Sequence, residues 1–491
     1  MKKFLTRPDI VPLLIIIYAF ILFLPGFFLY FHQDDFIHFS VSQNLSQVVN
    51  AFDIFAKGQF HFYRPIPTQG YFFFGRLFFG LNPLSFHIIN FIIFSINIFL
   101  VFFLVKSLAK SKNTARIAVL IYGINSTHVA PLFAAAYVHE LLYVFFALLC
   151  LLTYIRSHGI KNKPFIFYFL SVIFFILALM TKENAVILPG ILLIYEIFII
   201  RASINQIIKK LFPFAFILLI YLLGHFFFYG LAQSPSYQVI IGKPTINIFL
   251  WYVLWALSVP NILIDFIGPK LYLNPVFFKV AGPHAYISLL SIPLLIILIS
   301  LLLFIFILNN RKNDKFRLLM FGVCWFIIGL IPLLPFPLHK LGTEQAFSLV
   351  GLSTVIGLII INALKSHAGK IISSIFIIIY IINATNSIIL ARSTHWIERS
   401  ADQAQSVISY MQKTYPKLPD NAVIYFENGQ ISIPQYGSSR QLYQSTGGGF
   451  GLNLMLQKPD LFVYFQDIDN PPKTNENKLL IKIDSSKFLG Y

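Results

Sequence analysis

The sequence predicts an all-α polytopic membrane protein of about 11 transmembrane helices, followed by a small C-terminal α/β domain. Of its 491 residues, 57% are hydrophobic and 11% are charged, and 55 are phenylalanine. A soluble globular protein does not contain so large a share of apolar side chains. Apolar windows of about 20 residues, long enough to cross a bilayer as a helix, recur along the chain. Short basic clusters separate these windows, as in membrane proteins whose loops face the cytoplasm.

The net charge of +18 does not indicate a nucleic-acid partner, because the basic residues are scattered between apolar spans and form no continuous patch. The two cysteines, Cys150 and Cys324, both lie within apolar runs. Neither a disulfide framework nor a zinc site is therefore predicted.

The basic clusters set the orientation of the spans, and we place all of them in the cytoplasm. They are Lys2/Lys3/Arg7, Lys106/Lys110/Lys112/Arg116, Arg156/Lys161/Lys163, Arg201/Lys209/Lys210, Arg311/Lys312/Lys315/Arg317 and Lys365/Lys370. The predicted spans are 10–31, 85–105, 115–134, 138–155, 164–181, 185–200, 211–230, 286–308, 317–335, 345–363 and 371–390. The N-terminus then lies inside and the C-terminus outside.

Two apolar segments, 10–31 and 246–268, could each be something other than an ordinary membrane span. The first, 10–31, is not followed by a small-residue cleavage site, so we expect a retained helix. The second, 246–268, contains Pro260, Asn261 and Asp265, and a crossing there would place the following basic cluster outside. We expect this segment to be re-entrant or to lie in the outer interface. A twelfth span is the alternative, and it would move the C-terminal region to the cytoplasm.

Residues 1–391 form the predicted membrane module, whose first outer loop is 32–84. A short surface helix is expected at 44–52, and the aromatic amphipathic stretch 66–81 suits the membrane interface.

From residue 392 the composition becomes polar, so 392–491 is predicted to be a small soluble domain outside the membrane. A helix is expected at 394–414 and strands at 422–426, 461–465 and 479–483. The Gly447-Gly448-Gly449 run lacks a strand-to-helix context and predicts a flexible turn rather than a phosphate loop.

With this topology, most acidic residues of the membrane module fall on the outer face. They are Asp34, Asp35, Asp53, Glu140, Glu183, Asp265 and Glu344. Only Asp9, Asp314 and Glu196 are expected near the inner face. A transporter more often carries ionisable groups near the bilayer midplane. The distribution favours chemistry at the membrane–water boundary, with a lipid or sugar-lipid transporter or flippase as the alternative.

Asp34 and Asp35, directly after the first span, are the leading catalytic candidates. Acids beside lipid are costly and point to function. One could serve as general base toward an acceptor hydroxyl, while the other orients it or shares a divalent cation with it. A purely structural interface cap is the other interpretation.

Arg64, in Tyr63-Arg64-Pro65, is a candidate phosphate ligand, because guanidinium binds phosphate in a two-pronged manner. An ion pair with Asp34, Asp35 or Asp53 is equally expected. Lys182, next to Glu183 at a tight outer helix junction, could meet a lipid phosphate or simply snorkel at a helix end.

His139 and Glu140 open the fourth span, where Glu140 could brace the site or contact sugar hydroxyls. The pair is a weak metal signal by itself. Glu344 lies in an outer loop with His339 and Lys340, which could meet an anionic headgroup, although a plain interfacial loop is the favoured interpretation. Besides the catalytic candidates Asp34 and Asp35, the predicted substrate-binding residues are Arg64, Lys182, Glu183, Glu140, His139 and Glu344.

These motifs, in their order and sidedness, resemble the GT-C superfamily of integral-membrane glycosyltransferases, which includes protein O-mannosyltransferases, their tetratricopeptide-linked relatives and lipid A aminoarabinose transferases. The resembling residues are Asp34-Asp35, Tyr63-Arg64-Pro65, the Asn82-Pro83 entry to the second span, Lys182-Glu183-Asn184-Ala185 and the outer loop before Glu344. The resemblance covers about residues 8–400.

The resemblance implies a polyprenyl-phosphate-linked sugar donor, such as a mannosyl or other hexosyl lipid, and a hydroxyl acceptor on a protein, lipid or glycan. It also implies inversion at the anomeric carbon. Asp34 would be the base and Asp35 its neighbour, and Arg64 and Lys182 would meet the donor phosphate. The site would face outward from a prokaryotic plasma membrane, with membrane lipids around it and no nucleic acid involved.

Overall fold

The computed structural model describes residues 9–56, 62–159, 164–230, 234–310, 313–429, 439–472 and 479–488. Some basic residues predicted to face the cytoplasm lie outside these ranges: Lys2, Lys3, Arg7, Lys161, Lys163, Arg311 and Lys312.

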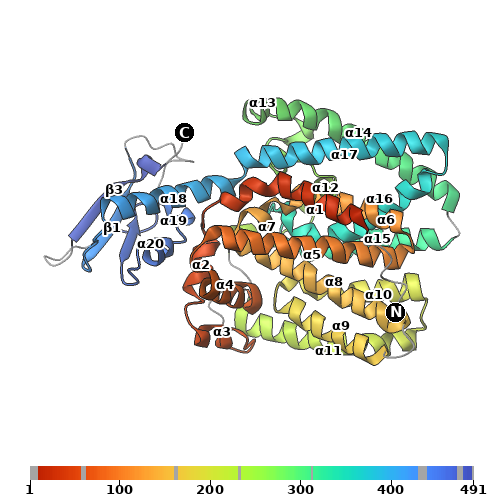
Figure 1. Cartoon of the computed structure of the whole chain (residues 1–491), viewed down its shortest axis with the longest axis horizontal. Coiled ribbons are helices and arrows are strands. Elements are labelled where there is room, and N and C mark those ends of the chain that lie inside the picture. The colour runs from red at the N-terminus through yellow and green to blue at the C-terminus, as the bar shows by residue number, and fades with distance from the viewer. Residues whose placement is uncertain are drawn as a thin grey trace.

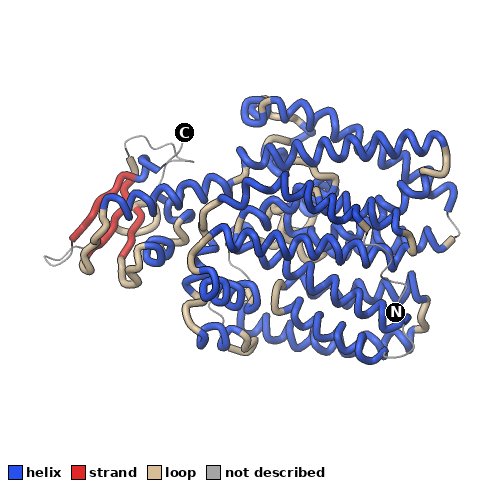
Figure 2. The backbone as a smooth tube through the Cα atoms, in the orientation of Figure 1, coloured by secondary structure: helices blue, strands red, loops and turns tan. Residues whose placement is uncertain are grey.

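The described chain is a bundle of long helices with a small sheet domain at one end (Figure 1; Figure 2). Its α-helices are α1 Ile10–Phe23, α2 Asp34–Ser40, α3 Leu45–Ala51, α4 Tyr71–Phe79, α5 Pro83–Ala109, α6 Lys112–Gly123, α7 Val129–Phe133, α8 Val138–Gly159, α9 Pro164–Leu179, α10 Leu188–Tyr195, α11 Ile204–Gly224, α12 Lys243–Ala256, α13 Val276–Ala281, α14 Pro283–Asn310, α15 Asp314–Leu330, α16 Ala346–Ala363, α17 His367–Thr394, α18 Trp396–Thr414, α19 Ser439–Ser445 and α20 Phe450–Met455. Its strands are β1 Ala422–Glu427, β2 Phe462–Phe465 and β3 Leu479–Asp484.

The predicted membrane-helix architecture is confirmed. Within the described ranges, eight helical segments are long and apolar enough to cross a membrane. They are Ile10–Phe28, Pro83–Ala109, Ala135–Gly159, Glu183–Ile200, Ile204–Tyr229, Pro283–Asn310, Gly342–Ala363 and His367–Thr414. The other three predicted spans fall on α6, α9 and α15, helices of 12, 16 and 17 residues. At 1.5 Å per residue, each is shorter than the roughly 30 Å hydrocarbon layer.

The predicted span 115–134 is interrupted because α6 ends at Gly123 and the chain restarts as α7. Buried side chains from other helices satisfy carbonyls that such a break leaves open. The Tyr380 hydroxyl donates to the Ile121 carbonyl at 2.7 Å, and Asn90 donates to the Pro131 carbonyl at 3.1 Å. The breaks are therefore hydrogen-bonded parts of the core.

The ambiguous segment 246–268 contains the end of α12, a helix of 14 residues, and is not among the eight candidate spans. Asn383 of α17 donates to the carbonyls of Leu257 and Ser258 at 3.1 and 3.0 Å. The chain after α12 is thus fixed to the bundle by side-chain hydrogen bonds.

The two ends of the bundle differ in charge. We call them the domain end, where Asp34, Glu183 and Glu344 begin helical segments, and the basic end, where Lys110 and Lys365 follow long helices. The acids expected at the basic end are each paired there. Asp9 accepts from Arg116 at 3.1 Å, Glu196 accepts from Lys210 at 3.3 Å, and Asp314 accepts from Arg201.

The three predicted strands and the predicted helix at 394–414 are confirmed by β1, β2, β3 and α18. The strands pair in parallel in the order β2-β1-β3. Long helix α17 runs along the bundle and continues through α18 into this domain (Figure 1). The predicted domain boundary at residues 391 and 392 falls in the last turn of α17 and stays a prediction.

The C-terminal domain is docked onto the chain just before α2. The Gln33 N–H donates to the Ser445 carbonyl at 2.9 Å. A Cβ on Gly447, which has φ +61°, would lie 2.8 Å from the Gln33 carbonyl oxygen, and a Cβ on Gly451 would lie 2.8 Å from the Phe36 ring. The glycine-rich turn therefore allows a close approach of two backbones.

Candidate functional site

A cavity of about 380 Å³ opens at the domain end. Its lining is mostly polar or aromatic and comes from segments far apart in the sequence. The lining residues are Asp34, Ile37, His38, Phe62, Arg64, Thr68, Tyr137, His139, Glu140, Tyr237, His339, Leu341 and Glu344. Five of the eight predicted site residues therefore share one cavity wall.

Asp34 begins helix α2 and its side chain is exposed to this cavity. The preceding residue, Gln33, has φ 42°, a strained value for a side chain other than glycine. Its N–H is held by Ser445 of the C-terminal domain. Although the Asp34 side chain reaches the open cavity, desolvation by the surrounding protein raises the pKa of its carboxyl, and His139 and Arg64 oppose the shift.

Asp35 has the opposite environment. It is 1% exposed, and its two carboxylate oxygens accept backbone N–H bonds from Ala136 at 2.6 Å and from His32 at 3.1 Å. Burial raises the pKa of Asp35 to about 7, although these hydrogen bonds favour the ionised form. Asp35 thus ties the start of α2 to the start of the fourth predicted span, while Asp34 remains available at the cavity.

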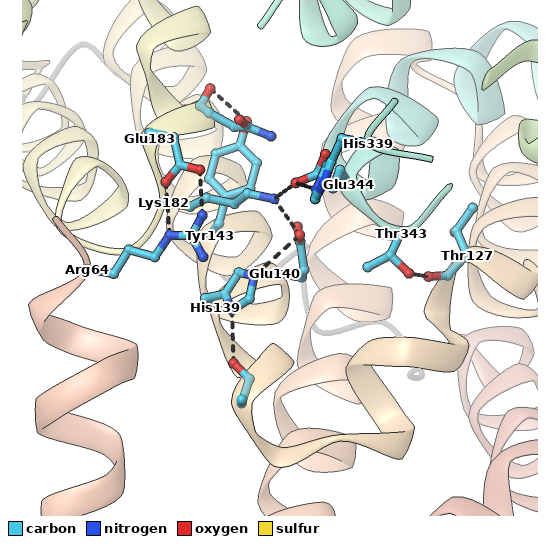
Figure 3. Close-up of polar contacts among 12 residues, drawn as sticks. Arg64, Thr127, His139, Glu140, Tyr143, Lys182, Glu183, His339, Thr343 and Glu344 are labelled. Atoms are coloured by element: carbon cyan, nitrogen blue, oxygen red, sulfur yellow. Dashed lines mark hydrogen bonds and ion pairs between the residues drawn. The ribbon is translucent and has the colours of Figure 1, made fainter. Parts of the chain in front are cut away.

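Arg64 is paired with Glu183, not with the aspartates of its own loop. Its Nε donates to Glu183 Oε2 at 2.9 Å and its Nη2 donates to Glu183 Oε1 at 2.5 Å (Figure 3). The guanidinium also lies 4.5 Å from the centre of the Phe62 ring, a cation–π contact. Arg64 also lines the cavity. Since Glu183 occupies only part of its five N–H donors, the others are available to a ligand there.

Lys182 is completely buried and connects two acids (Figure 3). Its ammonium donates to Glu140 Oε1 and, at 3.3 Å, to Glu344 Oε1. Glu140 is 1% exposed and Glu344 is 10% exposed. A residue of the junction between α9 and α10 therefore fixes α8 to the start of α16. Lys182 braces the cavity wall and does not line it.

Two histidines lie beside the buried glutamates. His139 Nε2 lies 3.5 Å from Glu140 Oε1, and His339 Nε2 lies 3.5 Å from Glu344 Oε1. Tyr237 stacks on His339 with ring centres 4.5 Å apart. All three rings line the cavity.

His38, Tyr137 and Tyr237 line the cavity but were not among the predicted site residues. His38 follows Asp34 by four residues on α2, so helical spacing could have indicated it. Burial lowers the pKa of His38 to about 3. Tyr237 comes from a distant loop, and nothing in its local sequence marks it.

Within the parts of the chain that the structure describes, no group of three or more His, Cys, Asp or Glu side chains is arranged to hold a metal ion. Both oxygens of Asp35 are already used by backbone N–H groups. A cation shared by Asp34 and Asp35 would compete with those bonds.

A second cavity, of about 770 Å³, lies on the other side of Asp34. It is formed between α2 and the C-terminal domain. Its lining residues are Gln33, Asp34, Ile37, Ser40, Val41, Trp396, Tyr443, Gln444, Gly447, Gly448 and Phe450. Asp34 and Ile37 thus separate two openings, one walled by the helix bundle and one by the C-terminal domain.

No protein-family model and no characterised protein sequence matches the chain. Among solved structures, it is similar to the apo form of an Archaeoglobus fulgidus oligosaccharyltransferase, with 14% identity, a TM-score of 0.48, and coverage of 93% of this chain and 64% of that chain. The archaeal oligosaccharyltransferase AglB from the same organism, in complex with an inhibitory peptide and a dolichol-phosphate, matches with 13% identity, a TM-score of 0.46, and coverage of 91% and 64%.

A third match is the Archaeoglobus fulgidus enzyme tethered to an acceptor peptide containing the NVT sequon, with 14% identity, a TM-score of 0.46, and coverage of 93% and 64%. The chain thus spans less than two thirds of the length of these structures. Each of the three matched structures is of an oligosaccharyltransferase.

Proposed function

We propose that the protein is a membrane glycosyltransferase that moves a sugar from a polyprenyl-phosphate donor to a hydroxyl acceptor, with Asp34 as general base. The observation that carries the proposal is the position of Asp34 between two cavities. Group transfer needs two substrates to meet at one catalytic side chain. Asp34 is the acid that faces both openings, while its neighbour Asp35 is buried.

In this scheme the donor occupies the cavity that Arg64 lines. Free N–H groups of the guanidinium donate to the lipid phosphate, which gathers negative charge as the sugar leaves. Glu183 holds the guanidinium in a fixed plane through two hydrogen bonds. Lys182 acts one step further back, by holding Glu140 and Glu344 in the wall.

The acceptor hydroxyl approaches Asp34 from the cavity beside the C-terminal domain. Its oxygen attacks the anomeric carbon from the face opposite the phosphate, and the bond from that carbon to the phosphate oxygen breaks with inversion. The hydroxyl proton passes to the Asp34 carboxylate. The surrounding protein raises the pKa of this carboxyl, and a more basic carboxylate accepts a proton more readily.

We place the site on the extracytoplasmic face of a plasma membrane. The basis is the excess of basic residues at the opposite end of the bundle, which marks the cytoplasmic side of membrane proteins. The C-terminal domain then lies outside the membrane together with the site.

The test is sugar transfer by the purified full chain in nanodiscs, with a panel of polyprenyl-phosphate sugars and with peptide, glycan and lipid hydroxyls as acceptors. Release of polyprenyl phosphate and labelled product are both measured, with EDTA and with added Mg²⁺ or Mn²⁺. Asp34→Asn is expected to lower turnover by about 10²–10⁴-fold, the usual contribution of a general base.

Asp53→Asn is the matched control, because Asp53 is an exposed aspartate of the same predicted loop that does not line the cavity. It should retain full activity. Full activity of Asp34→Asn would refute the assigned base. Movement of labelled lipid across the bilayer without release of polyprenyl phosphate would instead support the transporter alternative.

A further inference from the structure

A third cavity, of about 390 Å³, lies at the basic end of the bundle, far from the proposed catalytic site. The ends of α5, α16 and the segment Glu196–Ile200 meet there with the starts of α6 and α15. These elements come from distant parts of the sequence, so only the packed bundle creates this cavity.

The lining of this cavity is strongly cationic. Five basic side chains contribute to it and one carboxylate, that of Asp314. The basic residues are Lys110, Arg201, Lys315, Arg317 and Lys365. Asp314 is already paired with Arg201 and lies 3.8 Å from Arg317. The formal charge of the lining, five positive groups less one negative group, is therefore +4. Among the described residues, the ion pairs of Asp314 are with Arg201 and Arg317, not with Lys315 or Lys365.

Lys315, at the start of α15, and Lys365, just after α16, both line the cavity. The nearby Lys365 ammonium lowers the pKa of Lys315. The acceptor beside Lys315 Nζ is Asn362 Oδ1 at 3.5 Å, which is long for a hydrogen bond. Two like charges in this position lower the cost of binding an anion between them.

Apart from the polar residues Ser111, Thr114 and Asn362, the rest of the lining is apolar and includes Leu108, Phe198, Ile199, Leu358 and Ile361. Three candidate membrane spans, Pro83–Ala109, Glu183–Ile200 and Gly342–Ala363, end beside it. The cavity therefore lies where the hydrocarbon layer gives way to phosphate headgroups. A free anion would need only the basic groups, whereas a lipid also uses the apolar wall.

We infer that this cavity binds the phosphate headgroup of an anionic phospholipid, with Lys315 and Lys365 on either side of the phosphate. Basic pockets between transmembrane helices are suited to such headgroups. The negative charge of the bound phosphate would offset part of the charge of the two lysines and hold together α5, α15 and α16. This inference does not depend on the proposed glycosyl transfer.

The test is binding of phosphatidylglycerol to the delipidated full chain, measured by native mass spectrometry, with phosphatidylcholine and inorganic phosphate as comparison ligands. Replacing both lysines, Lys315→Gln with Lys365→Gln, should weaken phosphatidylglycerol binding by about 30-fold, since each lysine near a lipid phosphate contributes about a fivefold factor. Phosphatidylcholine should bind the parent and the variant equally weakly.

The control is Arg156→Gln with Lys209→Gln, which removes the same charge from exposed residues near the same end of the bundle that do not line the cavity. It should change phosphatidylglycerol binding by less than about twofold. Equal losses in the two double variants would overturn the inference in favour of a diffuse surface charge. Equal binding of inorganic phosphate and phosphatidylglycerol by the parent would overturn the assignment to a lipid.

The lysine variant is expected to fold, because the substitutions remove a repulsion. Its melting temperature in detergent without lipid should equal or exceed that of the parent. If its yield is low, Lys110→Gln replaces it, since Lys110 is exposed at the cavity edge, and an approximately fivefold loss is expected.

Discussion

Replacing Lys182 by methionine is expected to destabilise the helix bundle more than replacing either of its acidic partners. Lys182 is fully buried and donates to two carboxylates, Glu140 and Glu344. Methionine has a similar length but no charge, so the substitution leaves two carboxylates close together inside the protein. Removing one partner of a buried ion pair costs about 3–5 kcal/mol. We therefore expect Lys182→Met to lower the free energy of unfolding by about that amount.

Glu140→Gln should be much milder. It leaves Lys182 with Glu344, a neutral pair, and the amide oxygen introduced by the substitution can still accept a hydrogen bond from the ammonium. The expected cost is about 1 kcal/mol, the net value of one hydrogen bond. Combining Lys182→Met with Glu140→Gln removes one of the two stranded carboxylates, so the double variant should be more stable than Lys182→Met alone.

The assay is unfolding of the purified chain in mixed detergent micelles, followed by near-UV circular dichroism as the share of SDS increases. The order of stability is the informative result: parent, then Glu140→Gln, then the double variant, then Lys182→Met. Equal losses in Glu140→Gln and Lys182→Met would show that charge balance does not govern this cluster and would refute the reasoning.

Three further predictions concern the walls around Asp34. Burial raises the pKa of Asp35 from 3.8 to about 7, so between these values the folded state holds a proton that the unfolded state has lost. This group therefore lowers the free energy of unfolding as the pH rises from about 4 to about 7. Asp35→Asn should remove that part of the pH dependence of unfolding. Arg64→Lys keeps the charge but loses the planar fork, so the KM for the lipid donor should rise about 10-fold in the transfer assay. Gly447→Ala should release the C-terminal domain, detected as faster proteolysis, because its Cβ would lie 2.8 Å from the Gln33 carbonyl oxygen, whereas Gly282→Ala, also at positive φ but with open space around it, should not.

Each of these has a result that would contradict it. An unchanged pH dependence in Asp35→Asn would mean that another group titrates in this window. An unchanged KM in Arg64→Lys, with the fold intact, would remove Arg64 from the donor site. Equal proteolysis of Gly447→Ala and Gly282→Ala would attribute the effect to backbone strain, which both positions share at φ +61° and +53°.

The fold class, the helices and the strands could be predicted because they rest on local patterns. Apolar runs of sufficient length become helices, and short apolar runs rich in β-branched and aromatic residues, such as 422–426, become strands. The grouping of acids toward one end also followed from sequence, because a helix that spans a membrane carries its flanking residues to a defined side. The eight predicted site residues are accordingly found at one end of the bundle, around one cavity and its wall.

The lengths and breaks of the helices were less accessible to sequence. The region 115–134 reads as one apolar span, yet the chain bends after Gly123. The bend is stabilised because Asn90 and Tyr380, from other helices, donate to the open carbonyls of Pro131 and Ile121. A hydropathy profile contains no information on hydrogen bonds from side chains that are distant in the sequence.

By itself, the sequence determined what kinds of side chain are present at the domain end. Only the tertiary structure decided which of them reach solvent and which neutralise each other. Asp34 and Asp35 are adjacent and chemically identical, but one faces two cavities and the other accepts two backbone hydrogen bonds. Arg64 lies in the same predicted loop as three aspartates, yet pairs with Glu183, 119 residues away. The reason is physical: burial and ion pairing depend on distances in space, and packing of distant helices sets those distances.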